Sequence, residues 1–325
     1  MPASDVWYGR STTARLASAA LTPASWLYAL CWEAYEAAYA WGLKRPAEPH
    51  RPVLCVGSLS VGGSGKTPVA CHVAEVLLRI GRQVVLSASG YRSPAESGAS
   101  VAPVGPLSAR EWGDEPALIR WLLPEVPLIV GRDRVRAAKL CNERFPGAVL
   151  VLDDGFQHLR LEKHLSLVLD EPNPPNRRCL PAGPYREPRG GLSRADLVLP
   201  GKFQVESRIA GFSLHGEADL PEGEWQGRPV SVLCALGRPD RFLSDLESLG
   251  LLIERKSLFG DHDPLDEGNL LQAVPEDFPV VVSGKDWQKL RERPDVRSRA
   301  FWIARHEVRV TPESEFEGWL RDGLA

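Results

Sequence analysis

The sequence predicts an α/β protein with a doubly wound parallel sheet, a smaller second α/β domain and an amphipathic helix at its N-terminus. Three observations support this prediction. Short apolar segments alternate with helical segments over much of the chain, which is the pattern of βαβ units. A glycine-rich loop joins the first apolar segment to the helix that follows it. A polar stretch at residues 203–227 interrupts the alternation, which then resumes.

The first domain is expected to hold six short strands, each a run of apolar residues, with helices between them. In the helix expected at Pro68–Gly81, the apolar face includes Val73 and Leu77. A further helix is expected at Glu115–Leu123. The predicted strands are Val53–Val56, Val84–Ser87, Leu128–Val130, Val149–Leu152, Leu165–Leu169 and Ala195–Leu199.

Four segments follow from the changes in composition along the chain. Residues 206–229 contain several turn-forming residues, so we predict a linker region there. The second unit is expected to carry a strand at Val230–Leu236, a helix at Arg241–Leu249 and strands near Val280–Val282 and Phe301–Ala304. The predicted segments are a helical segment at 1–45, a core domain at 46–205, the linker at 206–229 and the second domain at 230–325.

Composition excludes several classes of protein. Hydrophobic residues make up 43% of the 325 residues and charged residues 25%, so a packed core is expected rather than disorder. The net charge of −3 argues against a dedicated nucleic-acid binder, which usually carries a basic excess. The six cysteines are scattered without a CxxC pair, which favours reduced thiols in the cytosol over a zinc site or a disulfide framework.

The N-terminal segment Leu21–Leu43 is rich in Trp, Tyr and Ala, and its apolar residues recur at helical spacing. Glu33 and Glu36 interrupt it, so a full membrane span would bury charge at considerable cost. A helix lying in the membrane interface suits the aromatic residues better. An amphipathic helix packed on the protein's own core is the alternative.

The loop at residues 60–67 carries the strongest chemical signal. It follows a predicted strand and opens a predicted helix, which is the context of a P-loop. Its glycines allow backbone N–H groups to turn toward a phosphate, and the helix N-terminus favours the negative charge. Lys66 is expected to contact the β- and γ-phosphates and Thr67 to ligate Mg²⁺. We therefore expect nucleoside triphosphate binding by Ser60, Val61, Gly62, Gly63, Ser64, Gly65, Lys66 and Thr67.

Two consecutive acids end the predicted strand Val149–Leu152. Asp153 is expected at the metal, because P-loop proteins place a carboxylate there. Asp154 points the other way and is a candidate to accept a proton from a substrate hydroxyl. His158 could orient or tune that carboxylate if the chain turns at Gly155. A solvated turn with an exposed histidine is the alternative.

Other polar clusters are less specific. Asp114 and Glu115 precede a predicted helix, where first-turn acids need no function, but they could also support Mg²⁺. Arg186 lies in a rigid, glycine-rich loop and could bind phosphate bidentately. His262 stands between two acids in a turn, and the block Ser283–Asp286 either reads a nucleotide base or forms a surface turn.

These blocks, in order, resemble the tetraacyldisaccharide 4′-kinase family. The resemblance rests on VGSLSVGGSGKTP, SGYRS, GDEP, GRDRVRAA, LDDGFQHLRL, PAGPYREP, SRAD, FGDHDPL and GKDW. The pair VGGSGKTP and DDGFQH is its most specific part, and Ser60 in place of the usual first glycine fits the family's pattern.

The resemblance implies an ATP- and Mg²⁺-dependent kinase that phosphorylates the 4′-hydroxyl of a lipid A precursor at the cytoplasmic face of the bacterial inner membrane. It implies that Asp154 is the base, helped by His158, and that Asp114, Glu115 and Glu187 support the metal and phosphates. It also implies that His262 contacts the nucleotide. We expect a monomer with peripheral or monotopic membrane attachment and no nucleic-acid partner. The alternatives are a P-loop GTPase or metal-insertion chaperone and a non-catalytic nucleotide-binding scaffold.

Overall fold

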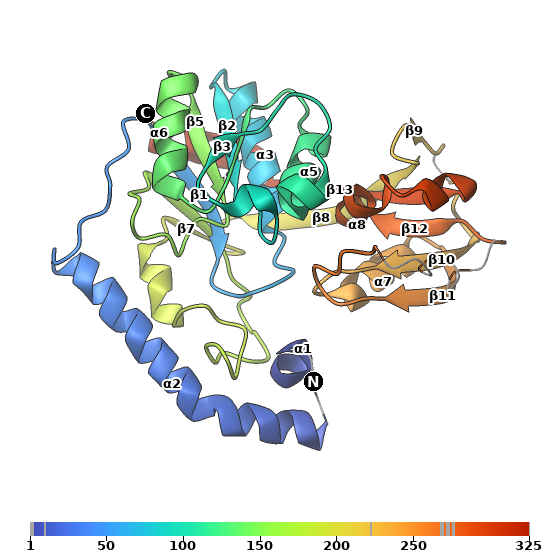
Figure 1. Cartoon of the computed structure of the whole chain (residues 1–325), viewed down its shortest axis with the longest axis horizontal. Coiled ribbons are helices and arrows are strands. Elements are labelled where there is room, and N and C mark those ends of the chain that lie inside the picture. The colour runs from blue at the N-terminus through green and yellow to red at the C-terminus, as the bar shows by residue number, and fades with distance from the viewer. Residues whose placement is uncertain are drawn as a thin grey trace. The chain divides into compact units, whose positions relative to one another are not determined.

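The computed structural model describes residues 3–9, 11–221, 223–266, 270, 274 and 277–324. Its elements are labelled in Figure 1. The chain forms two compact units, each assembled from segments that lie far apart in the sequence. The first unit comprises Met1–Ala88, Asp133–Val205 and Val310–Ala325, and the second comprises Ser89–Arg132 and Glu206–Arg309.

A parallel sheet forms the centre of the first unit. Its strands are β1 (Val53–Ser58), β2 (Val84–Ala88), β5 (Val149–Asp153), β6 (Leu165–Leu169) and β7 (Leu197–Leu199). They lie in the order β2-β5-β1-β6-β7, and each neighbouring pair is parallel. Every residue of β1, β2, β5 and β6 is buried, which explains their nearly continuous apolar runs. The sheet confirms the predicted α/β architecture.

Helices connect and cover these strands. They include α3 (Lys66–Arg79), α6 (Arg134–Arg144) and α9 (Glu313–Gly323), with a 3₁₀ segment η2 (Arg189–Arg194). Helix α3 begins where Gly65, at φ +77°, ends the glycine-rich loop. The imidazole ring of His72 in α3 stacks on the ring of Phe316 in α9, with centroids 6.2 Å apart. The C-terminal helix therefore packs within the first unit.

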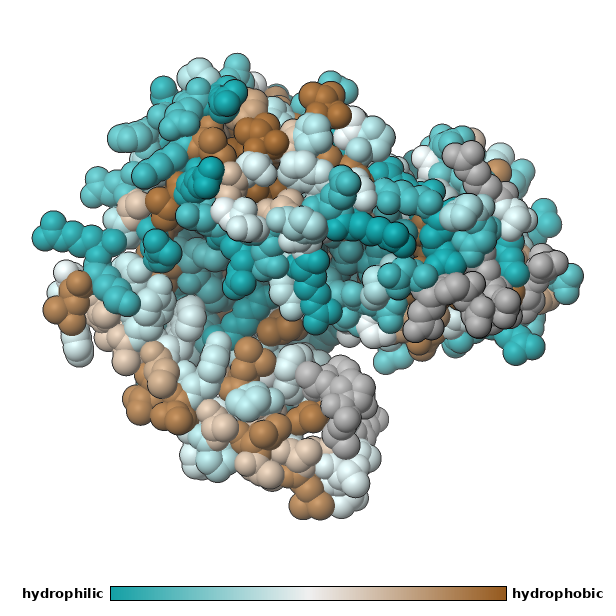
Figure 2. Space-filling model, in the orientation of Figure 1, coloured by the Kyte–Doolittle hydropathy of each residue, from teal (hydrophilic) through white to brown (hydrophobic). Residues whose placement is uncertain are grey.

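The N-terminal helix α2 (Thr12–Ala40) follows a short helix α1 (Ala3–Tyr8) and turns its polar side inward. Ser18 and Ser25 are buried, whereas Trp26 is 70% exposed and Leu27 63% exposed. Apolar side chains accordingly gather on the surface along this helix (Figure 2). The predicted apolar face is therefore the exposed, outer face of α2. The alternative prediction, in which that face packs on the protein's own core, is wrong. Among the described residues, no helix has the length and apolar character needed to cross a membrane.

The second unit contains another sheet, in the order β11-β10-β12-β13-β8-β9. Its strands are β8 (Gln204–Leu214), β9 (Ala218–Asp219), β10 (Pro229–Cys234), β11 (Leu252–Leu258), β12 (Val280–Ser283) and β13 (Phe301–Thr311). Strand β10 pairs in parallel with β11 and β12, and β12 with β13, while β8 and β9 are antiparallel. Its helices are α7 (Pro239–Ser248) and α8 (Gly284–Leu290), with a 3₁₀ segment η4 (Pro294–Ser298).

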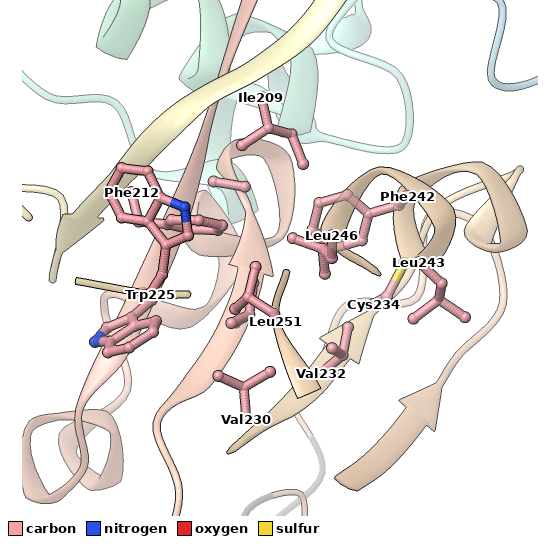
Figure 3. Close-up of a cluster of buried hydrophobic side chains, with 13 residues drawn as sticks. Ile209, Phe212, Trp225, Val230, Val232, Cys234, Phe242, Leu243, Leu246 and Leu251 are labelled. Atoms are coloured by element: carbon pink, nitrogen blue, oxygen red, sulfur yellow. The ribbon is translucent and has the colours of Figure 1, made fainter. Parts of the chain in front are cut away.

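Aromatic and aliphatic side chains fill one face of this second sheet. Phe212 and Trp225 meet edge to face with ring centroids 5.3 Å apart, and Phe242 and Leu246 of α7 are buried in the same cluster (Figure 3). Contacts of this kind dominate core energetics because aromatic side chains bury large apolar areas. The second unit therefore has a hydrophobic core of its own.

The segment Ser89–Arg132 also belongs to the second unit. It contributes the antiparallel pair β3 (Ser100–Val101) and β4 (Leu128–Val130), the helices α4 (Ala109–Trp112) and α5 (Asp114–Leu122), and the 3₁₀ segment η1 (Pro94–Glu96). Gly284 of α8 lies so close to Trp121 of α5 that an added Cβ would be 2.9 Å from that ring. Helices α5 and α8 therefore pack closely within this unit.

The observed organisation differs from the predicted segments in two respects. Residues 206–229, expected to be a linker, contain most of β8 and all of β9. Burial alternates only over the first half of β8, whereas Gly211, Phe212 and Ser213 are all buried, so both faces of the strand are covered there. Residues 89–132 and 310–325 also group with the unit opposite to the one expected from chain order, because tertiary packing rather than sequence proximity decides the grouping.

Candidate active site

The glycine-rich loop connects β1 to α3 in the first unit. Gly62, Gly63 and Gly65 all have positive φ, at +77°, +46° and +77°, a conformation that other residues rarely adopt. The Lys66 ammonium donates to the Ser64 hydroxyl over 3.1 Å. The loop therefore has the strand–turn–helix geometry of a P-loop.

A second loop is paired with the start of the P-loop. Val61 N donates to Pro184 O over 2.8 Å, and Arg186 N donates to Leu59 O over 2.7 Å. The backbone of Ser60 forms an antiparallel bridge with Tyr185. This pairing brings Arg186, from the loop expected to bind phosphate, beside the P-loop.

Thr67 and Asp153 meet at the carboxyl end of the sheet. The Thr67 hydroxyl donates to Asp153 Oδ2 over 2.7 Å, and Asp153 is buried at the end of β5. A hydroxyl and a carboxylate are oxygen ligands of the kind that Mg²⁺ prefers, so these two residues fit the metal expected there. Among the residues described, no cluster of three or more His, Cys, Asp or Glu suited to a metal occurs. A pair fits Mg²⁺ all the same, because this ion often takes only one or two carboxylates plus substrate phosphates.

Arg134 at the start of α6 holds the main chain of Asp153. It is 2% exposed, and its guanidinium donates to Asp153 O over 2.7 Å and to the Ser87 hydroxyl over 2.9 Å. Sequence reasoning missed this role, although Arg134 lies in the block GRDRVRAA. Nothing in the spacing alone indicated that its side chain turns inward beneath β5.

Asp154 adopts φ +56°, which is uncommon for a residue with a side chain. Arg186 Nη1 contacts both of its carboxylate oxygens, at 2.7 and 2.8 Å, and Lys66 Nζ lies 3.8 Å from Oδ2. Burial raises the pKa of Asp154, but Lys66, Arg186 and Arg134 together hold that pKa below its ordinary value. The carboxylate is therefore ionised and pairs with two cations of the phosphate-binding region.

His158 lies four residues further along, on the same loop. Its backbone N donates to Gly155 O over 3.1 Å, so the chain does turn at Gly155 as expected. The partly buried ammonium of Lys163 donates to the carbonyls of Phe156 and His158 over 3.2 and 3.0 Å. The partnership of the His158 ring with Asp154 stays a prediction.

Glu187 lies in a different cluster from Thr67 and Asp153. Its side chain is fully buried, its Oε1 accepts from Gln157 Nε2 over 2.7 Å, and its Oε2 pairs with Arg194. Burial raises the pKa of Glu187, against the opposing effects of Arg194 and Gln157. These contacts indicate that the carboxylate is held by protein donors. Sequence reasoning did not single out Gln157 or Arg194, although both lie in blocks that carry the family resemblance.

Asp114, Glu115 and His262 come together within the second unit. His262 Nδ1 lies 3.3 Å from Asp114 Oδ2, and its Nε2 lies 3.9 Å from Glu115 Oε1. Burial raises the pKa of Asp114, but His262, Lys289 and Lys285 hold it below the ordinary value. His262 also packs edge to face on Tyr91, with ring centroids 5.3 Å apart. These sequence-distant residues thus form one charged cluster, although helix capping alone could have explained the two acids.

The block Ser283–Asp286 is a helix start rather than an open recognition loop. Asp286 N donates to the Ser283 hydroxyl over 3.1 Å, and that hydroxyl lies 2.8 Å from Asp286 Oδ2. Asp286 is fully buried and also accepts from Ala235 N over 3.2 Å. The Asp286 carboxylate is therefore occupied by hydrogen bonds within the second unit. This removes the main sequence feature that suggested recognition of a guanine base.

The comparison with known families decides the assignment. The model of LpxK, described as tetraacyldisaccharide-1-P 4′-kinase, matches residues 17–325. The chain belongs to the tetraacyldisaccharide-1-P 4′-kinase family. This membership confirms the resemblance and the expectation of an ATP-dependent kinase, and it disfavours a GTPase or metal-insertion chaperone.

Individual relatives of the kinase family agree over most of the chain. The tetraacyldisaccharide 4′-kinase of Geobacter metallireducens is 36% identical over 303 residues, covering 85% of this chain and 89% of the relative. The tetraacyldisaccharide 4′-kinase of Geobacter sulfurreducens is 37% identical over 303 residues, and the match covers 85% of this chain and 85% of the relative. The crystal structure of the "apo" form of LpxK from Aquifex aeolicus in complex with ATP matches with a TM-score of 0.79 and 27% identity. This match covers 95% of this chain and 99% of the other.

Proposed function

We propose that this chain transfers the γ-phosphoryl group of ATP to the 4′-hydroxyl of a tetraacylated disaccharide 1-phosphate, a precursor of lipid A. The observation that carries this proposal is the joining of the P-loop to two consecutive acids: Thr67 bonds Asp153 while Lys66 faces Asp154. A metal-binding acid and a candidate base at adjacent positions suit transfer to a hydroxyl. The names of the family and of its relatives supply the acceptor.

The phosphate side of the reaction is assigned to the P-loop and Arg186. Backbone N–H groups at residues 60–67 and the N-terminus of α3 offer donors and a favourable dipole to the β- and γ-phosphates. Lys66 and Arg186 add positive charge, and the Arg186 guanidinium suits bidentate phosphate binding. In this class of reaction, positioning and charge stabilisation supply most of the catalysis.

Thr67 and Asp153 would hold Mg²⁺. When bound, the ion neutralises charge on the β- and γ-phosphate oxygens. Arg134 keeps the Asp153 main chain in place through its 2.7 Å bond to the carbonyl. Because protein donors already hold the Glu187 carboxylate, we assign Glu187 to the support of the neighbouring loop.

Asp154 is proposed to accept the proton of the acceptor hydroxyl. As the hydroxyl oxygen forms its bond to the γ-phosphorus, the bond from that phosphorus to the bridging oxygen breaks and ADP leaves. The cations that pair with Asp154 are the ones assigned to the phosphates, so nucleotide binding draws them from the carboxylate and frees it for the hydroxyl. His158 is proposed to assist, as an imidazole can orient a carboxylate.

We assign to His262, a residue of the second unit, the role of contacting the nucleotide. Asp114, 3.3 Å away, fixes the orientation of the imidazole. Glu115 pairs with Lys285 over 3.3 Å, so it and Asp114 are proposed to act through this cluster rather than as metal ligands.

The outer face of α2 is proposed to contact the cytoplasmic face of the bacterial inner membrane as a peripheral or monotopic attachment, with the protein a monomer. Trp26, Leu27, Leu30 and Trp41 are each at least 61% exposed, and Trp favours the interface. A substrate with four acyl chains cannot leave a bilayer easily, because each buried CH₂ contributes about 0.8 kcal/mol. An enzyme acting on its headgroup must therefore work at the interface.

The decisive experiment is incubation of the full chain with γ-labelled ATP and a tetraacylated disaccharide 1-phosphate in detergent. The proposal expects label at the 4′ position, and a matched reaction with γ-labelled GTP should transfer far less. Nucleotide binding without transfer to the lipid would favour the non-catalytic scaffold. Efficient transfer from GTP, or label at another position, would contradict the proposed donor or acceptor.

A further inference from the structure

The inner face of α2 contacts residues 186–194 at three successive turns. Tyr28, Trp32 and Glu36 are spaced four residues apart, so they lie along one side of the helix. The Tyr28 hydroxyl donates to Arg186 O over 2.7 Å, and Trp32 Nε1 donates to Glu187 Oε2 over 3.2 Å. Glu36 Oε1 lies 2.7 Å from Arg194 Nε. All three contacts are made by polar atoms, unlike the contacts of an ordinary apolar helix face.

The residues held by α2 in turn contact the loop that carries the candidate base. Arg194 pairs with Glu187 and lies 4.5 Å above the ring of Phe156. Glu187 accepts from Gln157 Nε2, which also donates to Ser58 O over 3.0 Å at the end of β1. A continuous series of contacts therefore runs from α2 to residues 156–157.

This series ends at Asp154. Gln157 Oε1 accepts from Arg186 Nη1 over 3.4 Å, and the same nitrogen binds both carboxylate oxygens of Asp154. Phe156 also lies close against β1, because its Cβ would be 2.5 Å from a Cβ added at Gly57. The loop thus has little freedom while Arg194 and Glu187 stay in place.

The buried charges make this arrangement sensitive to α2. Glu187 is fully buried, and Arg194 is its cationic partner. Removing one member of a buried ion pair leaves an uncompensated charge, which forces the remaining groups to rearrange. Arg194 bridges two carboxylates, one on α2 and one beside Gln157, so losing its ion pair with Glu36 leaves the guanidinium over Phe156 held by Glu187 alone.

We propose that Trp32, Glu36 and Arg194 are positioning residues through which helix α2 sets the geometry of the Asp154 loop for phosphoryl transfer. Helix α2 then has two distinct faces: the outer face meets lipid, and the inner face forms part of the frame of the catalytic site. This inference rests on the proposed kinase function. It requires that damage to the inner face slows the chemical step even with an acceptor that needs no membrane.

The test compares Glu36→Gln with Glu33→Gln in the full chain. Both substitutions remove one carboxylate from α2, but Glu33 is exposed and forms no ion pair with any described residue. The acceptor is a water-soluble, short-chain disaccharide 1-phosphate, assayed with ATP and Mg²⁺. We expect Glu36→Gln to lower kcat about tenfold with KM for ATP changed less than about twofold, because small misplacements of reacting groups are costly. Glu33→Gln should match the wild type.

Three further measurements decide the interpretation. Thermal unfolding and binding to phosphatidylglycerol vesicles should be the same for both variants, which separates positioning from folding and from membrane attachment. Trp32→Phe, which removes one donor and keeps the packing, should show the same split between kcat and KM if Glu36→Gln unfolds. In Arg194→Lys the effect of Glu36→Gln should largely vanish, since contacting residues are not additive. Unchanged kcat in both Glu36→Gln and Trp32→Phe would overturn the inference, whereas an inactive wild type would overturn the proposed function itself.

Discussion

Arg186 Nη1 lies 2.7 and 2.8 Å from the two carboxylate oxygens of Asp154, although 31 residues separate them in the sequence. Lys66 Nζ lies 3.8 Å from the same carboxylate. The proposed base and the proposed phosphate ligands therefore neutralise one another within the first unit. Phosphate oxygens brought by ATP must compete with Asp154 for these two cations. This competition links nucleotide binding to exposure of the base.

The first prediction concerns stability and pH. Burial raises the pKa of Asp154, but the opposing effect of Lys66, Arg186 and Arg134 is larger. The pKa in the folded protein therefore lies below the ordinary 3.8. A depressed carboxyl pKa contributes stability above the ordinary pKa, and this contribution is lost as the pH falls through the folded value. The free energy of unfolding of the wild type should therefore exceed that of Asp154→Asn at neutral pH, with the difference shrinking below about pH 4. Urea unfolding across this range measures it, with Asp322→Asn, an exposed site, as a control that should show no such trend.

The second prediction concerns the chemical step. Asp154→Asn should lower kcat by about a hundredfold or more, because proton transfer by a positioned group contributes on that order. The KM for ATP should not rise, since an amide leaves the P-loop intact and no longer competes as a charge with the phosphates for Lys66 and Arg186. Steady-state kinetics with varied ATP measure both constants. Loss of ATP affinity instead of kcat would make Asp154 a metal ligand and contradict the division of roles between Asp153 and Asp154.

The third prediction concerns Lys66. Lys66→Ala should reduce turnover by on the order of a hundredfold, the usual loss when one charge-stabilising donor is removed from a transition state. The fold should persist, because the side chain lies in a loop-to-helix junction outside the core. Lys139→Ala on the exposed side of α6 is the matched control and should keep wild-type turnover. Wild-type activity in Lys66→Ala would remove the P-loop assignment.

The fourth prediction concerns Thr67 and Mg²⁺. Thr67→Val removes the hydroxyl but keeps the shape, so the Mg²⁺ concentration for half-maximal activity should rise about tenfold or more, as expected for the loss of one ligand-supporting group. Thr67→Ser keeps the hydroxyl and should stay near the wild type. Titration of activity with Mg²⁺ at saturating ATP distinguishes the two. Equal Mg²⁺ dependence in both variants would show that the hydroxyl does not serve the metal.

The fifth prediction concerns the outer face of α2. Leu27 and Leu30 are 63% and 61% exposed, so replacing both by Ser should leave the fold unchanged. Binding to phosphatidylglycerol vesicles should weaken by about tenfold or more, given roughly 1.5–3 kcal/mol for each fully buried leucine. Leu78→Ser, at a 43% exposed leucine of α3, is the control and should bind like the wild type. Co-sedimentation with vesicles measures the effect, and unchanged binding of the double variant would place the membrane contact elsewhere.

Some features of the site were predictable from local sequence patterns. The apolar run before Asp153 predicts a buried strand with an acid at its end, and the glycines before Lys66 predict the turn into α3. Local patterns suffice there because backbone conformation and burial are set within a few residues. The apolar face of α2 was also predicted from the helical spacing of its apolar residues, and the structure decided between its two predicted surroundings by leaving that face exposed.

The sequence by itself determined the parallel α/β core, the P-loop and, through its family motifs, the kinase assignment. Only the tertiary structure decided that β8 occupies the expected linker, that Arg186 pairs with Asp154, and that Glu187 is held by Arg194 and Gln157. The physical reason is that ion pairs and buried hydrogen bonds join residues that no local periodicity relates. Their partners are fixed when the sheet brings distant loops to one edge, and that step depends on the packing of the whole unit.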